Sequence, residues 1–187
     1  MDKNLVLNWS DFINITDLTY NEKGEGGVYL WGFTIENTFV PYYIGITDNI
    51  IYRIHEHLNL IIGGRYTIYH HDSLVNFKGF KKQGVQEDKS QGIIYSPDWP
   101  KGYKHFIDIR KMLQPHIDYM IDRFTFSFAK VDQQQITSNN LEDIEKICIA
   151  QIGIENLANQ RGGYSDKFII QHIGNPNITK LVKSNSR

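Results

Sequence analysis

The chain has 187 residues, 41% of them hydrophobic and 13% aromatic, with a formal net charge of −1. This length and composition predict one globular domain over residues 1–187 with a sizeable buried core. No apolar stretch approaches the roughly 18 residues of a membrane-spanning helix, and no secretory signal is visible, so we expect no association with a membrane. The single cysteine, Cys148, excludes an internal disulfide and a thiolate metal cluster, and it favours a reducing, cytoplasmic setting.

The charges are unevenly distributed along the chain. Residues 63–104 contain seven Lys or Arg against four Asp or Glu, and residues 159–187 contain five against one. The remaining blocks, 1–62 and 105–158, are net negative. A near-neutral protein with such a pattern is able to present a basic face to phosphates. Solvated loops and a basic tail explain the same pattern equally well.

The first predicted elements are two strands and a helix. Residues 28–34 (VYLWGFT) and 39–47 (FVPYYIGIT) read as the strands of a hairpin. Thr47 or Asp48 is expected to cap a following helix, whose apolar residues recur at helical spacing until a Gly-Gly pair ends it.

The later elements are less regular. Residues 65–104 have no sustained periodicity and are interpreted as an insertion. A helix is predicted at about 105–121, bent or broken near Pro115. Residues 123–131 alternate Phe with polar residues as a half-buried strand does, and the segment starting at Leu141 (LEDIEKICIAQI) has helical periodicity.

These elements predict an α+β fold, a small three-stranded antiparallel sheet flanked by helices. Its core is expected at about 27–62 and 105–160, with the insertion at about 65–104 and a tail at 161–187.

Two polar residues border the apolar stripe of the first helix. Arg53 and His57 are one turn apart, so both are expected at the edge of the core beside the sheet. That position suits a functional site. The alternative is a surface Arg53 paired with Glu56 and an ordinary helix-face histidine.

The late helix carries a carboxylate on its apolar side. Glu145 falls within the apolar stripe, whereas Glu142 and Asp143 are expected to face solvent. A buried carboxylate must meet a cation, an arginine or a metal ion. A plain salt bridge from Glu145 to Arg53 or Arg123 is the alternative to a metal site.

Two tyrosines of the hairpin complete the set. If the hairpin loop has an odd number of residues centred on Glu36, Tyr29 and Tyr43 stand opposite each other on one face of the sheet. Two phenols, an arginine, a histidine and a carboxylate then converge, a set that is able to hydrolyse a phosphodiester. Tyrosines are also ordinary strand residues, which is the alternative.

These residues form a recognisable signature. GVY at 27–29 and YIG at 43–45, followed by YIGITDNIIYRIHEH, resemble the GIY-YIG nuclease family and its pattern YIGxTxxxxxRxxxH. The thirteen residues between the two elements imply a longer hairpin loop than usual.

The resemblance implies metal-dependent cleavage of DNA by an endonuclease. Tyr29 would activate the water, with His57 and Tyr43 assisting through hydrogen bonds, and Arg53 would hold the scissile phosphate. Glu145 would hold Mg²⁺ or Mn²⁺. The family's terminal asparagine is matched by Asn159, with Asn156 as a competitor.

Double-stranded DNA is the expected partner, and the positively charged blocks are the expected grip. Bases and aromatics interleave there, as on a surface that binds the backbone and stacks on bases. The alternative is that the aromatics pack the insertion onto the core. The candidate DNA-binding residues are Arg65, Lys78, Lys81, Lys82, Arg161 and Lys167.

Two other functions stay open at this point. One is a nucleic-acid-binding module that is catalytically silent or depends on a partner protein. The other is a zinc-binding interaction domain that uses His55, His57, His70 and His71, although His55 and His57 point in different directions on a helix.

A nuclease with one site must form a homodimer or act twice to cut both strands.

Overall fold

The structure is a computed structural model that describes residues 3–18, 25–75, 92–97, 103–131, 138–153, 157, 163 and 165–184. The strands are β1 (Lys3–Trp9), β2 (Ile13–Asn14), β3 (Gly27–Ile35), β4 (Thr38–Thr47), β5 (Ile68–Tyr69), β6 (Ile93–Tyr95), β7 (Phe124–Lys130) and β8 (Phe168–Gly174). The helices are α1 (Ile50–Ile62), α2 (His71–Val75), α3 (Tyr103–Asp122), α4 (Ser138–Ile152) and α5 (Pro176–Ser184), with a 3₁₀ turn, η1, at Ile15–Asp17.

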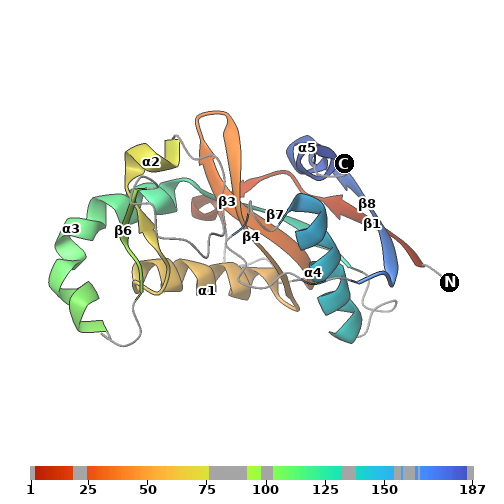
Figure 1. The fold of residues 1–187 in the computed structure, drawn as a ribbon, viewed down its shortest axis with the longest axis horizontal. Coiled ribbons are helices and arrows are strands. Elements are labelled where there is room, and N and C mark those ends of the chain that lie inside the picture. The colour runs from red at the N-terminus through yellow and green to blue at the C-terminus, as the bar shows by residue number, and fades with distance from the viewer. Residues whose placement is uncertain are drawn as a thin grey trace.

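A six-stranded mixed sheet forms the centre of the fold, in the order β4-β3-β7-β1-β8 with β2 beside β7 (Figure 1). Its strands are antiparallel except for β8, which runs parallel to β1. The α+β class is therefore correct, but the prediction of a small three-stranded antiparallel sheet is wrong. The three predicted strands are β3, β4 and β7, and the sheet continues beyond them.

The additional strands come from the two ends of the chain. Leu7 and Trp9 of β1 are buried while Val6 is 50% exposed, and Phe168 of β8 is buried while Ile169 is 58% exposed. This alternation is what a strand with one buried face requires. Strand β1 pairs with β7 and β8 pairs with β1, so together they supply hydrogen-bond partners and an apolar cover on that side of the sheet.

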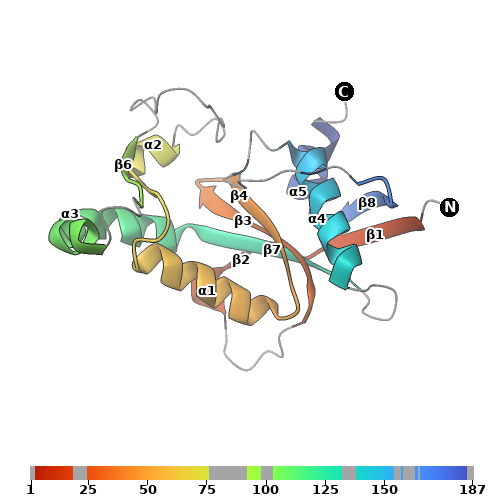
Figure 2. The same cartoon turned by 60° about the horizontal axis from the view of Figure 1, so that its bottom comes forward.

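Both faces of the sheet are covered, so the protein has two apolar clusters. On β3, Tyr29, Trp31 and Phe33 belong to the cluster shared with α1 and α3. Val28 and Leu30 belong to the cluster shared with α4 and α5. Figure 2 shows α1 on one side of the β3–β4 hairpin and α4 on the other. The edge strand β4 therefore lies between the two helices that carry the candidate site residues.

The described parts of the predicted insertion are packed onto the core. Strand β5 pairs with β6, and Ile68, Leu74 and Tyr95 are buried in the cluster next to α3. Helix α3 runs unbroken through Pro115, so of the two predicted outcomes, a bend or a break, the break is excluded. The Pro115 side chain is exposed, and its ring points to solvent instead of disturbing the packed face. None of the helices in the described part of the chain combines the length and the apolarity needed to cross a bilayer.

Candidate active site

A bulge in the hairpin sets the positions of the two tyrosines. Near the turn Ile35 pairs with Thr38, but the register shifts between Trp31 and Gly32, so that Trp31 pairs with Tyr43 and Tyr29 with Gly45. The two tyrosines are therefore diagonal neighbours, and the prediction that they stand directly opposite each other is wrong. The shift still leaves both rings on one face, because residues two apart in a strand share a face. Their ring centroids lie 6.3 Å apart.

Gly45 provides the space that the Tyr29 side chain occupies. A Cβ built on Gly45 would lie 2.3 Å from the Tyr29 hydroxyl oxygen and 2.5 Å from the carbon that carries it. Real Cβ atoms do not approach other atoms so closely. The glycine of the YIG element is therefore needed here for steric reasons, because the phenol crosses directly over it.

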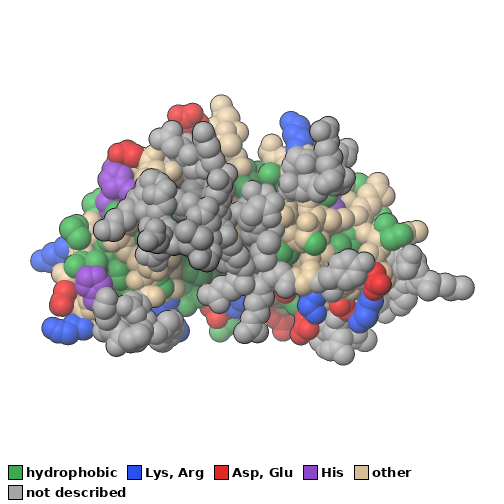
Figure 3. All heavy atoms as spheres, in the orientation of Figure 1, with side chains coloured by type: hydrophobic (Ala, Val, Ile, Leu, Met, Phe, Trp, Pro, Cys, Tyr) green, Lys and Arg blue, Asp and Glu red, His purple; other side chains and the backbone are tan. Residues whose placement is uncertain are grey.

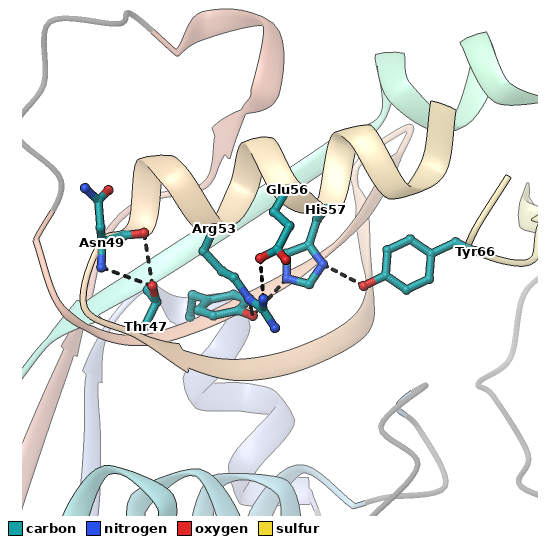
Figure 4. A network of polar contacts seen from close by, with 7 residues as sticks. Thr47, Asn49, Arg53, Glu56, His57 and Tyr66 are labelled. Atoms are coloured by element: carbon teal, nitrogen blue, oxygen red, sulfur yellow. Dashed lines mark hydrogen bonds and ion pairs between the residues drawn. The ribbon is translucent and has the colours of Figure 1, made fainter. Parts of the chain in front are cut away.

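Helix α1 presents Arg53 and His57 to the same face of the sheet. The helix is capped by Asn49, whose side chain accepts a hydrogen bond from the Tyr52 backbone N–H at 3.0 Å. The predicted cap at Thr47 or Asp48 is thus one or two residues too early. Thr47 supports the cap instead, since its Oγ1 accepts from the Asn49 N–H at 3.0 Å (Figure 4).

A chain of hydrogen bonds joins four of the side chains. Arg53 Nε donates to the Tyr29 hydroxyl oxygen at 3.1 Å, and that hydroxyl lies 2.8 Å from His57 Nε2. His57 Nδ1 lies 2.7 Å from the Tyr66 hydroxyl (Figure 4). Nothing in the sequence connects Tyr66 to His57, because it follows the end of α1 by a turn. Only the fold brings it to the imidazole.

The protonation state of His57 follows from its surroundings. The side chain is 1% exposed. Burial, and then the positive charge of Arg53, lower the pKa of His57 to about 3. A neutral imidazole has one donor and one acceptor. The buried Tyr29 hydroxyl needs an acceptor, so it donates to Nε2, and Nδ1–H donates to Tyr66. Burial also raises the pKa of Tyr29 well above its usual range.

Arg53 is partly exposed and pairs with Glu56. Its side chain is 34% exposed, and Nη1 contacts Glu56 Oε2. This is the pairing that the sequence offered as the alternative to a functional arginine. The same guanidinium also donates to Tyr29, so the ion pair and the polar network share one side chain.

Glu145 approaches this group from the opposite helix. It is partly buried, and burial raises its pKa. Arg53 lies close enough to lower that pKa in turn, and Glu145 lies close enough to Tyr43 to raise the pKa of its phenol. The salt bridge that was the alternative to a metal site is not found: within the described residues no hydrogen bond or ion pair joins the Glu145 carboxylate to Arg53 or Arg123. Arg123 instead stacks over the Tyr119 ring at 3.6 Å.

The position of Glu145 therefore fits a ligand of a metal ion. A partly buried carboxylate without a bonded cation is stabilised in its charged form by a divalent ion. Carboxylate oxygen is a ligand that Mg²⁺ and Mn²⁺ prefer. The neighbouring Asp143 is different: it is 8% exposed and its Oδ2 lies 2.7 Å from Lys167 Nζ. The expectation that Asp143 faces solvent is wrong.

The predicted DNA-binding residues are only partly covered by the structure. Arg65 is exposed, and Lys167 forms the ion pair with Asp143. The positions outside the described residues are Lys78, Lys81, Lys82, Asn156, Asn159 and Arg161. On the face shown in Figure 3, the described Lys and Arg side chains are scattered with Asp and Glu between them.

Comparisons with protein-family models, with curated proteins and with solved structures give no match to this chain. The resemblance to GIY-YIG nucleases therefore depends on the quoted motifs alone.

Proposed function

We propose that this protein is a metal-dependent endonuclease that hydrolyses phosphodiester bonds in DNA. The observation that carries the proposal is the group formed around Tyr29: Arg53 and His57 are hydrogen-bonded to its hydroxyl, and Glu145 lies within electrostatic range of Arg53. These are the residues that the GIY-YIG resemblance implies. Among the described residues no cation is bonded to the Glu145 carboxylate, whereas an ordinary core ion pair would supply one.

Each side chain has a separate task in the proposed reaction. Glu145 would hold Mg²⁺ or Mn²⁺, which when bound polarises the phosphate and offsets its charge. Arg53 binds a phosphate oxygen through its exposed edge, and to do so it must share or leave Glu56. Electrostatic stabilisation of this kind is the largest contribution expected from the protein.

The Tyr29 hydroxyl is proposed to handle the proton of the attacking water. Its own proton is donated to His57 Nε2, so a lone pair of the oxygen is free to accept a proton from water as the phenol proton passes to the imidazole. The pKa of His57 rises for this step once a bound phosphate offsets the charge of Arg53. The Tyr29 side chain is 0% exposed, so the side chain of Arg53 or Tyr43 must shift before water reaches it. DNA binding is the event that we expect to cause this shift.

The substrate is proposed to be double-stranded DNA, cut either by a homodimer or in two successive steps. We place the activity in the cytoplasm, because a lone cysteine, here Cys148, is typical of proteins from a reducing compartment.

The test compares two carboxylates of the same helix. Wild-type protein, Glu145→Gln and Glu142→Gln are incubated with supercoiled plasmid and Mg²⁺, Mn²⁺ or EDTA. Glu142 is exposed one turn from Glu145 and is the matched control. We expect metal-dependent nicking or linearisation by the wild type and the control, and a loss of about a hundredfold or more in Glu145→Gln. Equal cleavage by all three proteins would refute the proposal.

One observation favours a second function, a nucleic-acid-binding module without activity of its own. Tyr29 has no exposed surface and Arg53 already has an anionic partner, an arrangement that suits a silent site or one that a partner protein opens. Binding of plasmid DNA by the wild type without cleavage in either metal would support this function.

A further inference from the structure

We infer that His70, His71 and His116 form a binding site for zinc or a similar transition-metal ion, which joins α2 to α3. His70 directly precedes α2, His71 is its first residue, and His116 lies on α3. Figure 1 shows these helices at the end of the molecule away from α4, and Figure 3 shows histidine side chains at the surface there. The site is separate from the residues around Tyr29.

The distances among the three rings suit a metal ion. Each histidine offers a ring nitrogen, and these atoms all lie within 4.8 Å of one another. Nδ1 of His71 lies 3.3 Å from Nδ1 of His116. A tetrahedral zinc ion about 2.0–2.1 Å from each nitrogen holds neighbouring ligand atoms about 3.3–3.4 Å apart. The His71–His116 pair already has this spacing, and a modest rotation of His70 brings in the third ligand.

Asp72 orients the central ligand. His71 Nε2 lies 3.0 Å from Asp72 Oδ1, a contact that favours a proton on Nε2 and leaves Nδ1, 3.3 Å from His116 Nδ1, for a metal ion. Histidines that bind metals commonly donate their other N–H to a carboxylate in this way. The competing contacts are long: the His71 backbone N–H approaches His116 Nδ1 at 3.4 Å, and the Asp72 N–H approaches His70 Nδ1 at 3.3 Å. A metal ion replaces weak bonds here.

The chemistry of the ligands selects the ion. Neutral imidazoles suit Zn²⁺, Cu²⁺ or Ni²⁺, whereas Mg²⁺ prefers oxygen. The side chains of His70 and His71 are 39% and 45% exposed, so a water molecule is able to fill the fourth position. Two of the four histidines that the sequence offered for zinc are absent from this cluster: His57 is held by Tyr29 and Tyr66, and His55 is not a member.

The ion would stiffen this part of the fold. Helix α2 has only five residues, too few to be stable by itself. A bond from its first turn to α3 would fix it and the adjoining β5–β6 pair. Because metal binds only the folded form of such a site, zinc raises the unfolding temperature.

Zinc binding is measured directly, with untagged, chelator-treated protein. Isothermal titration with Zn²⁺ alone is carried out on the wild type, His116→Ala, Asp72→Asn and His105→Ala. His105 is an exposed histidine of the same helix outside the cluster and is the matched control. We expect one zinc per chain in the wild type and the control. Asp72→Asn is expected to bind about 10–100-fold more weakly, and His116→Ala at least as weakly.

The thermal stability of each variant separates a metal site from a packing role. In EDTA, the unfolding temperatures of His116→Ala and the wild type should lie within a few degrees of each other. Of the wild type, His105→Ala and His116→Ala, zinc should raise the unfolding temperature only of the first two. Stoichiometric binding that is unchanged in His116→Ala would overturn the inference, as would no binding by the wild type. If His116→Ala does not fold, His70→Ala takes its place with the same expectations. None of these readouts depends on DNA cleavage.

Discussion

The neutral, buried His57 makes the free energy of unfolding of the protein fall as the pH falls. Its imidazole is enclosed by Tyr29, Tyr43 and Tyr66 and lies near the Arg53 guanidinium. Burial, followed by the positive charge of Arg53, lowers its pKa to about 3, whereas the same side chain in the unfolded chain titrates near about 6.5. As the pH falls below that value, the unfolded chain takes up a proton that the folded protein does not. Acid therefore favours unfolding.

The size of this effect follows from the two pKa values. Between pH 7 and pH 5 the difference costs the folded protein about 2 kcal/mol of its free energy of unfolding. The loss continues until the pH approaches the folded-state value of about 3 for His57. His172, whose pKa burial lowers to about 4, adds a loss of the same sign. The contribution of His57 is therefore isolated by comparing the pH-dependent loss of stability in the wild type with the loss in a His57 variant.

Urea unfolding at pH 7 and pH 5 measures the free energy of unfolding of the wild type, His57→Gln and His105→Gln. Tryptophan fluorescence reports on the transition, since the Trp31 ring centroid lies 5.3 Å from that of His57. The wild type and His105→Gln should lose about 2 kcal/mol more than His57→Gln between the two pH values.

The absolute stability of His57→Gln at pH 7 does not enter this comparison. Equal losses in all three proteins would refute the reasoning. Nitrogen-15 NMR of wild-type His57 gives a second check, because its ring signals should not titrate between pH 7 and pH 5. A midpoint near pH 6.5 would show that the imidazole is not held neutral.

Three further predictions concern single side chains. Gly45→Ala should lower the free energy of unfolding by about 1–3 kcal/mol in urea titrations, because its Cβ meets the Tyr29 hydroxyl, and Tyr29→Phe should recover part of that loss in the double variant. Cys148, which is 0% exposed and whose thiol pKa burial raises, should react with a thiol reagent only as fast as the protein unfolds. Lys167→Gln should lower the free energy of unfolding at neutral pH and progressively less in acid, because the Lys167 ammonium lowers the pKa of Asp143. Urea titrations that show the same loss at neutral and at acidic pH would contradict this.

The elements with strong local patterns were predictable. The strands expected at 28–34, 39–47 and 123–131 are β3, β4 and β7, and the helix expected to follow the hairpin is α1. Their periodicity lies within a short stretch of chain, so neighbouring residues are enough to reveal it. The placement of Arg53 and His57 one turn apart follows from the same helical spacing.

The register of the hairpin was not predictable in this way. It depends on the bulge opposite Trp31, where Tyr42 packs against the Trp31 ring with centroids 4.4 Å apart. The energy of that packing comes from both strands and from helix α1, which packs on them, so the sequence of either strand alone does not reveal it.

What the sequence by itself determined is the identity and local spacing of the polar groups: two tyrosines on one hairpin, Arg53 and His57 on one helix, and Glu145 on the apolar side of another. The tertiary structure decided which of them meet. It paired β1 with β8 across most of the chain length, brought Tyr66 to His57 and set His116 beside His71. Among the described residues it left no cation bonded to Glu145. Apart from the contact between Tyr66 and His57, these contacts join residues far apart in the sequence. They form only because burial of the apolar faces brings the elements together, and no local pattern records that outcome.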